Sequence, residues 1–250
     1  MKRSTNIDSK IYPIATIILI TLFWQIIVVV KKVPHYILPA PTDIIRALYS
    51  DYELILSHTK VTLYEAFVGF GLSLIFSFIL AIVMDSFEIV KKAFYPILVI
   101  SQTIPTIAIA PLFIIWFGFG TLPKIIVVIM VCFFPIVISL VDGLEKIDKD
   151  YLRLFHSMKA SKLQTFYHLK LPYAMVNLLS GLKIAATYMI MSAVVGEWLG
   201  GDKGIGVYIV RSKNAYALDK VFASILVVVI VSILIIYIID FIGNKLVHWK

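Results

Sequence analysis

The chain has 250 residues, a formal net charge of +8 at pH 7 and a mean hydropathy of +0.95. Its hydrophobic fraction is 60% and its charged fraction 15%, against roughly 45–50% and ~25% in soluble domains, which excludes an ordinary soluble protein. The positive charge requires no nucleic-acid partner, because recognisable zinc-finger and RNA-binding motifs are lacking and anionic lipid accounts for the charge. The single cysteine, Cys132, excludes an intramolecular disulfide and a thiolate metal cluster, and we predict no metal site.

Six apolar stretches are long enough to cross a bilayer as helices, which takes about 20 residues each. They are too long for the strands of a membrane barrel and do not alternate with period two. Helices also satisfy their own backbone hydrogen bonds, which lipid cannot do. The sequence therefore predicts an all-α polytopic membrane protein, with one transmembrane domain over residues 1–250. The predicted spans are residues 11–30, 61–84, 94–117, 125–141, 178–199 and 221–242.

The distribution of Lys and Arg predicts the orientation of these spans. More than half of the 23 basic residues fall in segments that share a side of the membrane with the N-terminus. Because basic residues gather on the cytoplasmic side, both termini are predicted to be cytoplasmic. The long polar stretch 142–174 is then a cytoplasmic loop.

That loop contains a predicted surface helix. Ser161 and Gln164 have the spacing of a capping box, which starts a helix, and Leu163 and Phe166 give it an apolar edge. Pro172 is predicted to end it, because proline lacks the amide donor. So short a helix is unstable alone and must rest on something. Two interpretations follow, docking in a groove of another protein or lying on lipid, and we favour docking.

Polar residues inside the spans are candidates for a solute pathway, because polar groups are costly in lipid. Serine and threonine can instead bond to their own helix, which keeps a structural role open for them. Glu197 could face the pathway, titrate, or hold the following glycine-rich loop through Lys203 or Arg211, and we favour holding the loop or gating over solute contact. The candidates are Gln102, Thr103, Pro105, Thr106, Thr187, Ser192 and Glu197.

Several linked motifs resemble a known family. The run ASKLQTF at residues 160–166, followed by Leu171 and Pro172, resembles the EAA loop of type I ABC importer permeases. LPAP at 38–41, PLFIIWFGFG at 111–120, FPI at 134–136, GLKIA at 181–185 and GEWLG at 196–200 resemble the nitrate/sulfonate/taurine branch of that family. Within this branch, QTIPT at 102–106 and the last two motifs are most similar to permeases assigned to pyrimidine precursors of thiamine.

The resemblance implies a transport subunit, not an enzyme, in a bacterial cell membrane. The implied partners are a cytoplasmic ATPase dimer, which binds ATP and Mg, an extracytoplasmic solute-binding protein and a second permease copy; no cofactor is implied for this chain. A small secondary transporter or a channel not driven by ATP is the alternative, although the sequence shows neither repeated halves nor a filter-like loop. The implied ATPase contact is Lys159, Ala160, Ser161, Lys162, Leu163, Gln164, Phe166 and Pro172.

The chain departs from the family pattern inside the loop. Arg153, Leu154 and Phe155 occupy the Glu-Ala-Ala positions, and Lys159 stands where the family has glycine. A lysine suits that bend only if the backbone avoids positive φ or if an acidic group or the partner accepts its charge. The resemblance therefore does not extend to the Glu-Ala-Ala and glycine positions of the loop.

Overall fold

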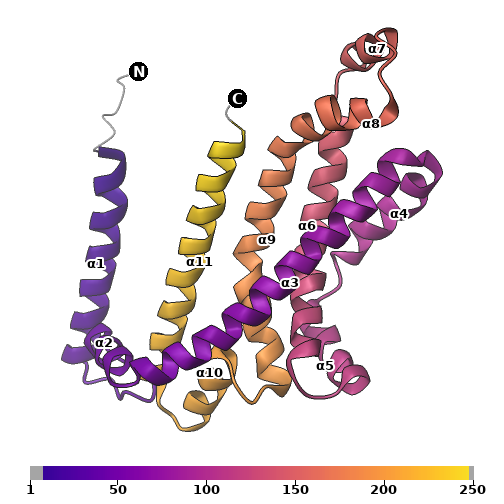
Figure 1. Ribbon diagram of the computed structural model, residues 1–250. Helices are drawn as coiled ribbons and strands as arrows, with labels where there is room; N and C mark the ends of the chain where they lie inside the picture. Colours follow the sequence, from indigo (N-terminus) through magenta and orange to yellow (C-terminus); the bar gives the residue numbers. More distant parts are fainter. Residues whose placement is uncertain (1–7, 248–250) are drawn as a thin grey trace. The chain divides into compact units, whose positions relative to one another are not determined.

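A computed structural model describes residues 8–247, and all regular elements within that range are helical (Figure 1). The chain divides into two compact units, which are described separately. Unit 1 contains residues 8–58 and 208–227 of the described range, and unit 2 contains residues 59–207 and 228–247. The elements are α1 (Asp8–Val30), α2 (Pro41–Ser50), α3 (Tyr52–Ser86), α4 (Glu88–Ser101), α5 (Thr106–Phe117), α6 (Thr121–Glu145), α7 (Lys149–Ser157), α8 (Lys162–Thr165), the π-helical segment η1 (Phe166–Lys170), α9 (Leu171–Gly200), α10 (Ile205–Asn214) and α11 (Leu218–Leu246).

Within the described residues, five helical stretches are long and apolar enough to cross a membrane, and a bent pair makes a sixth. The predicted all-α polytopic class is therefore confirmed. The helices extend beyond the predicted spans, and α3 alone has 35 residues. Hydropathy marks only the part of a helix that suits lipid, whereas backbone hydrogen bonding continues into the polar ends.

The third predicted span, 94–117, is not one straight helix. It is divided into α4 and α5, whose axes bend by 102° at a break of four residues. Pro105 precedes α5 in an extended conformation, and it cannot donate the backbone hydrogen bond that a continuous helix needs at this position. The proline therefore turns a span into two half-length helices.

The prediction that Pro172 ends the loop helix is wrong. Pro172 lies in the first turn of α9, where a missing amide donor does no harm, and residues 162–200 form one continuous helical stretch. The continuity passes through η1, in which the Leu171 amide donates to the Phe166 carbonyl, five residues earlier. This wider π-helical turn joins the loop helix to the span and avoids an interruption.

Unit 1 has its own small core and a partly buried polar contact. Its core includes Ile44 of α2 and Tyr208 of α10. Asp51 accepts hydrogen bonds from the Lys220 ammonium and the Tyr208 hydroxyl, both at 2.7 Å. The hydrogen bond from Lys220 contributes most to lowering the pKa of Asp51 below its usual 3.8, against the opposing effect of burial.

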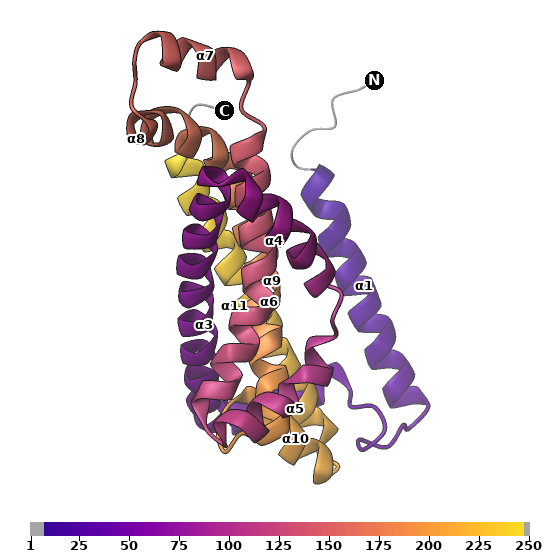
Figure 2. The ribbon, with the colours of Figure 1, turned by 90° about the vertical axis from the view of Figure 1, so that its right-hand side faces the viewer.

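Unit 2 is built on α6 and α9, which lie side by side in both views (Figures 1 and 2). Small residues bring these helices together. A Cβ atom on Gly181 of α9 would lie 2.7 Å from the Pro135 carbonyl oxygen of α6, and one on Gly143 would lie 2.9 Å from the Asn177 Cβ. Such close approach of backbones is how membrane helices gain packing contacts. At opposite ends of this pair lie α5 and the α7–α8 loop.

Candidate functional site

A cavity of about 470 Å³ lies where the broken span meets α6 and α9. Its volume is within the range of small-molecule sites. The break between α4 and α5 supplies one wall, so the bend described above is what opens the space. The lining residues are Ser101, Gln102, Ile104, Thr106, Ile107, Val127, Met130, Val131, Phe134, Pro135, Ile184, Tyr188, Met191, Ser192 and Val195.

The cavity is polar in places but carries no charged side chain among its lining residues. Three of the sequence-predicted pathway residues, Gln102, Thr106 and Ser192, line it. The Ser192 hydroxyl donates to the Met189 carbonyl of its own helix at 3.0 Å, so its hydrogen is already engaged. Gln102 is exposed and supplies both a donor and an acceptor. The cavity therefore suits an uncharged solute with hydrogen-bonding groups.

The four other predicted pathway residues, among them Glu197, which is described below, do not line this cavity. The Thr103 hydroxyl donates to the Ile100 carbonyl at 2.7 Å, and the Thr187 hydroxyl donates to the Lys183 carbonyl at 2.9 Å. Both threonines follow the structural alternative, in which the side chain bonds to its own helix. Pro105 shapes the cavity by forming the break, although it is not part of the wall.

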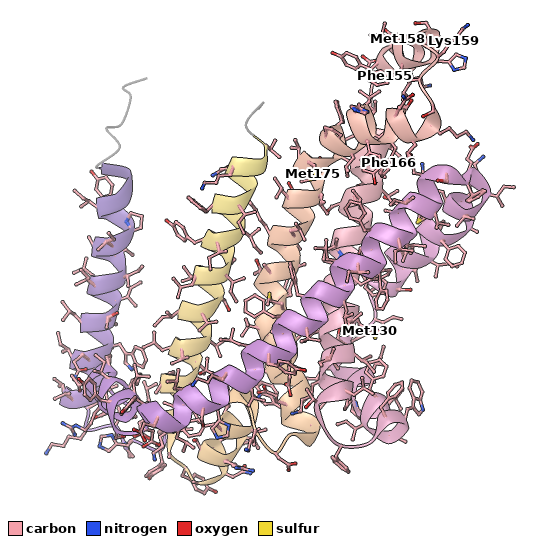
Figure 3. All side chains as sticks on the ribbon, in the orientation of Figure 1. Met130, Phe155, Met158, Lys159, Phe166 and Met175 are labelled. Carbon is pink, nitrogen blue, oxygen red and sulfur yellow. The ribbon has the colours of Figure 1, made fainter. Side chains whose placement is uncertain are left out.

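Much of the wall comes from residues that the sequence does not mark as functional. Met130 and Phe134 of α6 and Met191 of α9 are apolar residues inside apolar spans, and hydropathy cannot separate them from lipid-facing neighbours. Met130 is labelled on α6 in Figure 3. The spacing 127, 130, 131, 134 marks one face of a helix, but only packing tells which face meets a cavity.

The polar loop presents a second candidate surface, at the end of unit 2 away from α5. The predicted capping box at its helix start is confirmed: the Gln164 amide donates to the Ser161 hydroxyl at 3.2 Å, and the Gln164 side chain accepts from the Ser161 amide at 2.8 Å. Leu163 is 67% exposed and Met158 is 70% exposed. Apolar side chains this open on a short polar loop are typical of an interaction surface.

Phe166 differs from Leu163, although both were predicted on one apolar edge. It is half-buried within its own chain, and its ring stands edge-on to the Tyr167 ring at 5.8 Å between centroids. In Figure 3, Met158 and Lys159 lie at the outer turn of the loop, whereas Phe166 lies nearer the helices of the unit. Leu163 and Met158 are therefore the most exposed of the apolar side chains on the loop, and Phe166 supports the loop from within.

Lys159 adopts the backbone conformation that its family position favours. Its φ is +56°, in the left-handed region, which a side chain disfavours by roughly 1–2 kcal/mol. Of the alternatives that the sequence left open for this lysine, a bend without positive φ is therefore excluded. The loop keeps the turn that glycine makes easily, and lysine makes it under strain.

A buried polar cluster lies at the other end of unit 2, around Glu197. The side chain is 1% exposed; its Oε1 accepts from the Thr62 hydroxyl at 2.6 Å, and its Oε2 accepts from the Gly206 amide at 2.5 Å. The Ile205 amide donates to the Thr62 oxygen at 2.8 Å. Because α10 begins at Ile205, the carboxylate lies at a helix N-terminus, where negative charge is stabilised.

The contacts of Glu197 correct one detail of the sequence interpretation. Glu197 does hold the start of α10, but through a hydroxyl and a backbone amide; among the described residues Lys203 is not its partner, and a contact with Arg211 stays a prediction. Gly204 is required in this loop, since its φ is +124° and a Cβ there would lie 2.1 Å from the Glu197 carboxyl carbon. Spacing alone favoured charged neighbours and could not indicate backbone donors.

A second buried carboxylate lies beside the first. Glu65 of α3 is fully buried, and its Oε1 accepts from the Lys124 ammonium of α6 at 2.9 Å. Lys124 lies between the predicted spans 94–117 and 125–141, yet it is only 5% exposed. We call Thr62, Glu65, Lys124 and Glu197 the buried carboxylate cluster. It links α3, α6, α9 and the start of α10.

A multi-pass helical bundle with a broken span, a neutral cavity and an exposed polar loop defines a membrane transport subunit. Residues 73–248 match the family described as binding-protein-dependent transport system inner membrane component, and the chain belongs to this family. It is the permease subunit of an ABC importer, which works with an ATPase and a binding protein, and it is not an enzyme. This decides against the secondary transporter and the channel.

Two relatives and one solved structure illustrate the match. The chain is 35% identical to the formylaminopyrimidine transport permease protein ThiX of Halalkalibacterium halodurans, over 100% of this chain and 99% of the relative. It is 33% identical to a probable ABC transporter permease protein of Haemophilus influenzae, over 94% and 96%. A chain of the MetNI methionine ABC transporter in an inward-facing conformation has the same fold, with a TM-score of 0.59 at 19% identity, covering 79% of this chain and 94% of that one.

Proposed function

We propose that the cavity between the broken span, α6 and α9 is part of the solute pathway, and that the polar loop is the cytoplasmic contact with the ATPase. Both termini then lie in the cytoplasm, and the end of unit 2 that holds the buried carboxylate cluster faces the solute-binding protein. ATP and Mg bind to the ATPase subunits, which receive the loop in a surface groove. Pairing of nucleotide-loaded ATPase subunits moves the loop and opens the pathway outward.

One observation carries this proposal. The same unit presents exposed Leu163 and Met158 on a surface loop and a cavity of about 470 Å³ at a helix break. A loop that only rested on lipid would not need a capped helix that is joined to a span through a continuous helical turn. An apolar side chain on a rigid short helix is instead what helix-in-groove binding uses.

The cavity supports an uncharged solute. A sulfonate or nitrate ion would enter a space whose lining residues include no Lys, Arg or His, and burying an unpaired anion is costly. A pyrimidine precursor of thiamine presents a flat apolar ring with hydrogen-bonding edges, which Gln102, Tyr188 and Phe134 can meet. We therefore propose a pyrimidine of this class as the solute.

The cavity of a single chain needs a partner to close it. Ile107, Tyr188 and Met191 line the cavity and are still 55%, 44% and 54% exposed, so the cavity is open on one side of the single chain. We propose that an identical subunit covers this side. Two copies would then also present two loops to an ATPase dimer.

Reconstitution tests the function. Vesicles with this chain, its ATPase and its binding protein should take up the pyrimidine only with ATP, and should not take up taurine or nitrate. Ligand identification on the purified binding protein is the independent control. ATP hydrolysis by the purified chain alone at the rate of solute uptake would contradict the proposal.

The loop assignment is tested by a matched pair of substitutions. Leu163→Asp should release the ATPase, because truncating a buried interface anchor weakens binding by ~2 kcal/mol or more. Exposed Tyr173→Asp, in the first turn of α9 and outside the predicted ATPase contact residues, is the control and should leave the complex intact. Phe166→Asp should release the ATPase and also lower thermal stability, since Phe166 is half-buried in its own chain. Full retention of the ATPase by Leu163→Asp would refute the docking assignment.

A further inference from the structure

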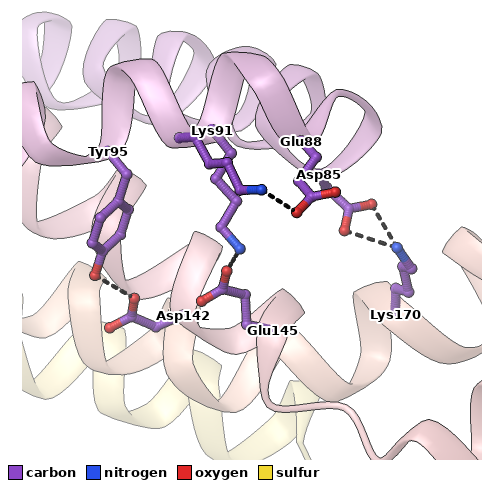
Figure 4. Close-up of polar contacts among 8 residues, drawn as sticks. Asp85, Glu88, Lys91, Tyr95, Asp142, Glu145 and Lys170 are labelled. Atoms are coloured by element: carbon purple, nitrogen blue, oxygen red, sulfur yellow. Dashed lines mark hydrogen bonds and ion pairs between the residues drawn. The ribbon is translucent and has the colours of Figure 1, made fainter.

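We infer that α4 passes the movement of the polar loop to the cavity, through three polar contacts that attach both ends of the loop to α3 and α4. These contacts are Asp85–Lys170, Lys91–Glu145 and Tyr95–Asp142, which we call the polar staple (Figure 4). The inference rests on the proposed function, since it takes the loop as the ATPase contact and the cavity as the solute pathway. It assigns positioning roles to residues that lie outside the cavity wall and outside the predicted ATPase contact residues.

The end of the loop is attached to α3. The Lys170 ammonium donates to both carboxylate oxygens of Asp85, at 2.8 and 2.9 Å, and the two side chains are 23% and 19% exposed. Lys170 is the last residue of η1, and Asp85 lies in the last turn of α3. A two-pronged, partly buried contact of this kind fixes the π-helical turn relative to α3.

The beginning of the loop is attached to α4. Lys91 forms an ion pair with Glu145, the last residue of α6, and the Tyr95 hydroxyl donates to Asp142 at 2.9 Å. Lys91 and Tyr95 are one helical turn apart on α4, and their acidic partners are about one turn apart on α6. Two contacts in register hold the helices in one relative position, which a single contact would not do.

The other end of α4 reaches the cavity. Ser101 ends α4 and lines the cavity with Gln102, only six residues after Tyr95, which is about 9 Å along a helix. α4 continues without a break from Glu88 to Ser101, although Pro96 removes one of its backbone hydrogen bonds, whereas the break at residues 102–105 can absorb a change in backbone angles. A displacement of the loop end of α4 therefore alters the wall that carries Gln102.

Another ion pair on α4 provides a control. Lys92 pairs with Glu88 at 2.8 Å one turn earlier in the same helix, and the two side chains are 74% and 77% exposed. This pair has the same chemistry and nearly the same position as Lys91–Glu145, but it joins α4 only to itself. If the staple acts by joining elements, changes at Lys92 should have no effect on coupling.

The test measures solute moved per ATP hydrolysed by the reconstituted complex of permease, ATPase and binding protein. Lys91→Glu and Glu145→Lys should each lower this ratio roughly two- to thirtyfold, the usual range for coupling residues, while ATP hydrolysis continues. The double reversal Lys91→Glu with Glu145→Lys should restore the ratio. Tyr95→Phe removes one hydroxyl only and should lower the ratio in the same direction, and Lys92→Glu should leave it unchanged.

The results separate this inference from the proposed function. Uptake by the wild type together with an unchanged ratio in Lys91→Glu and Tyr95→Phe overturns the staple alone. A loss that the double reversal does not restore also overturns it, because the effect is then a structural one. Absence of ATP-driven uptake in the wild-type complex overturns the proposed function itself.

Discussion

The two ends of unit 2 place charged side chains in different surroundings. In the buried carboxylate cluster, Glu65 is fully buried and Lys124 is 5% exposed, and the carboxylate of Glu197 is enclosed with a backbone amide. In the polar staple, Lys91 and Glu145 are 30% and 45% exposed. Water can replace a lost partner in the staple but not in the cluster.

This difference separates two uses of charge. A buried ion pair contributes little by forming and is costly to break, so the cluster specifies one arrangement of α3, α6 and α9. A half-exposed pair adds only ~0–1 kcal/mol, so the staple can guide a movement without locking it. The cluster is therefore expected to control folding, and the staple to control coupling.

The largest effect is expected for Lys124→Met. The substitution keeps the apolar stem that packs on Gly196 but leaves Glu65 buried without its cation, which should lower the free energy of unfolding by ~3–5 kcal/mol. Thermal unfolding of the purified protein measures this loss. Adding Glu65→Gln should recover most of it, because no charge then stays unpaired. A loss as small as that of Lys91→Met, expected at ~0–1 kcal/mol, would remove the distinction between the two ends.

Glu197→Gln is expected to have an intermediate effect. A glutamine side chain has a single oxygen, which can accept from either the Thr62 hydroxyl or the Gly206 amide, but not from both in the present geometry. Its NH2 group then faces the remaining donor, so the free energy of unfolding should fall by ~1–3 kcal/mol. Transport should fall as well, without a change in which solute is carried. Uptake measured for several solutes checks this, with Glu88→Gln at an exposed site as control. An altered solute preference would move Glu197 into the pathway.

Lys159→Gly should raise stability slightly at the loop end. Glycine relieves the strain of the positive φ but gains entropy in the unfolded chain, so we expect a net gain of ~0.5–1 kcal/mol. Lys162→Gly is the matched control, because Lys162 is helical and its replacement should cost ~1 kcal/mol. Denaturant unfolding of the two variants should show opposite signs. Equal losses would contradict the strained turn.

The smallest effect on stability is expected for Asp51→Asn in unit 1. The pKa of Asp51 is lowered, so its contacts with Lys220 and Tyr208 stabilise the fold fully above about pH 4. That contribution, ~1 kcal/mol or less for a partly exposed pair, should disappear as the pH falls below 3.8 and through the folded-state pKa. Asp51→Asn should lower stability at pH 7 but not at pH 2. A constant difference between the two proteins across this range would argue against the contact.

Local signals in the sequence determined much of this description. Long apolar stretches predicted the polytopic all-α class, the spacing of Ser161 and Gln164 predicted a capping box that the structure contains, and linked motifs indicated the permease family. These features depend on residues close together in the chain, whose hydrogen bonds and hydropathy can be read without knowing the packing. The same reasoning was wrong at Pro172, where a π-helical turn lets the helix continue.

Contacts between distant residues were decided only by the tertiary structure. Thr62 and Glu197 are 135 residues apart, and neither spacing nor hydropathy relates them. The cavity wall likewise depends on how far the chain bends at the break after Ser101 and on which apolar face of α6 packs beside it. The sequence shows Lys124 only as a basic residue between two spans, whereas the structure shows it as the buried partner of Glu65. The strength of such an ion pair depends on its surroundings, which packing creates.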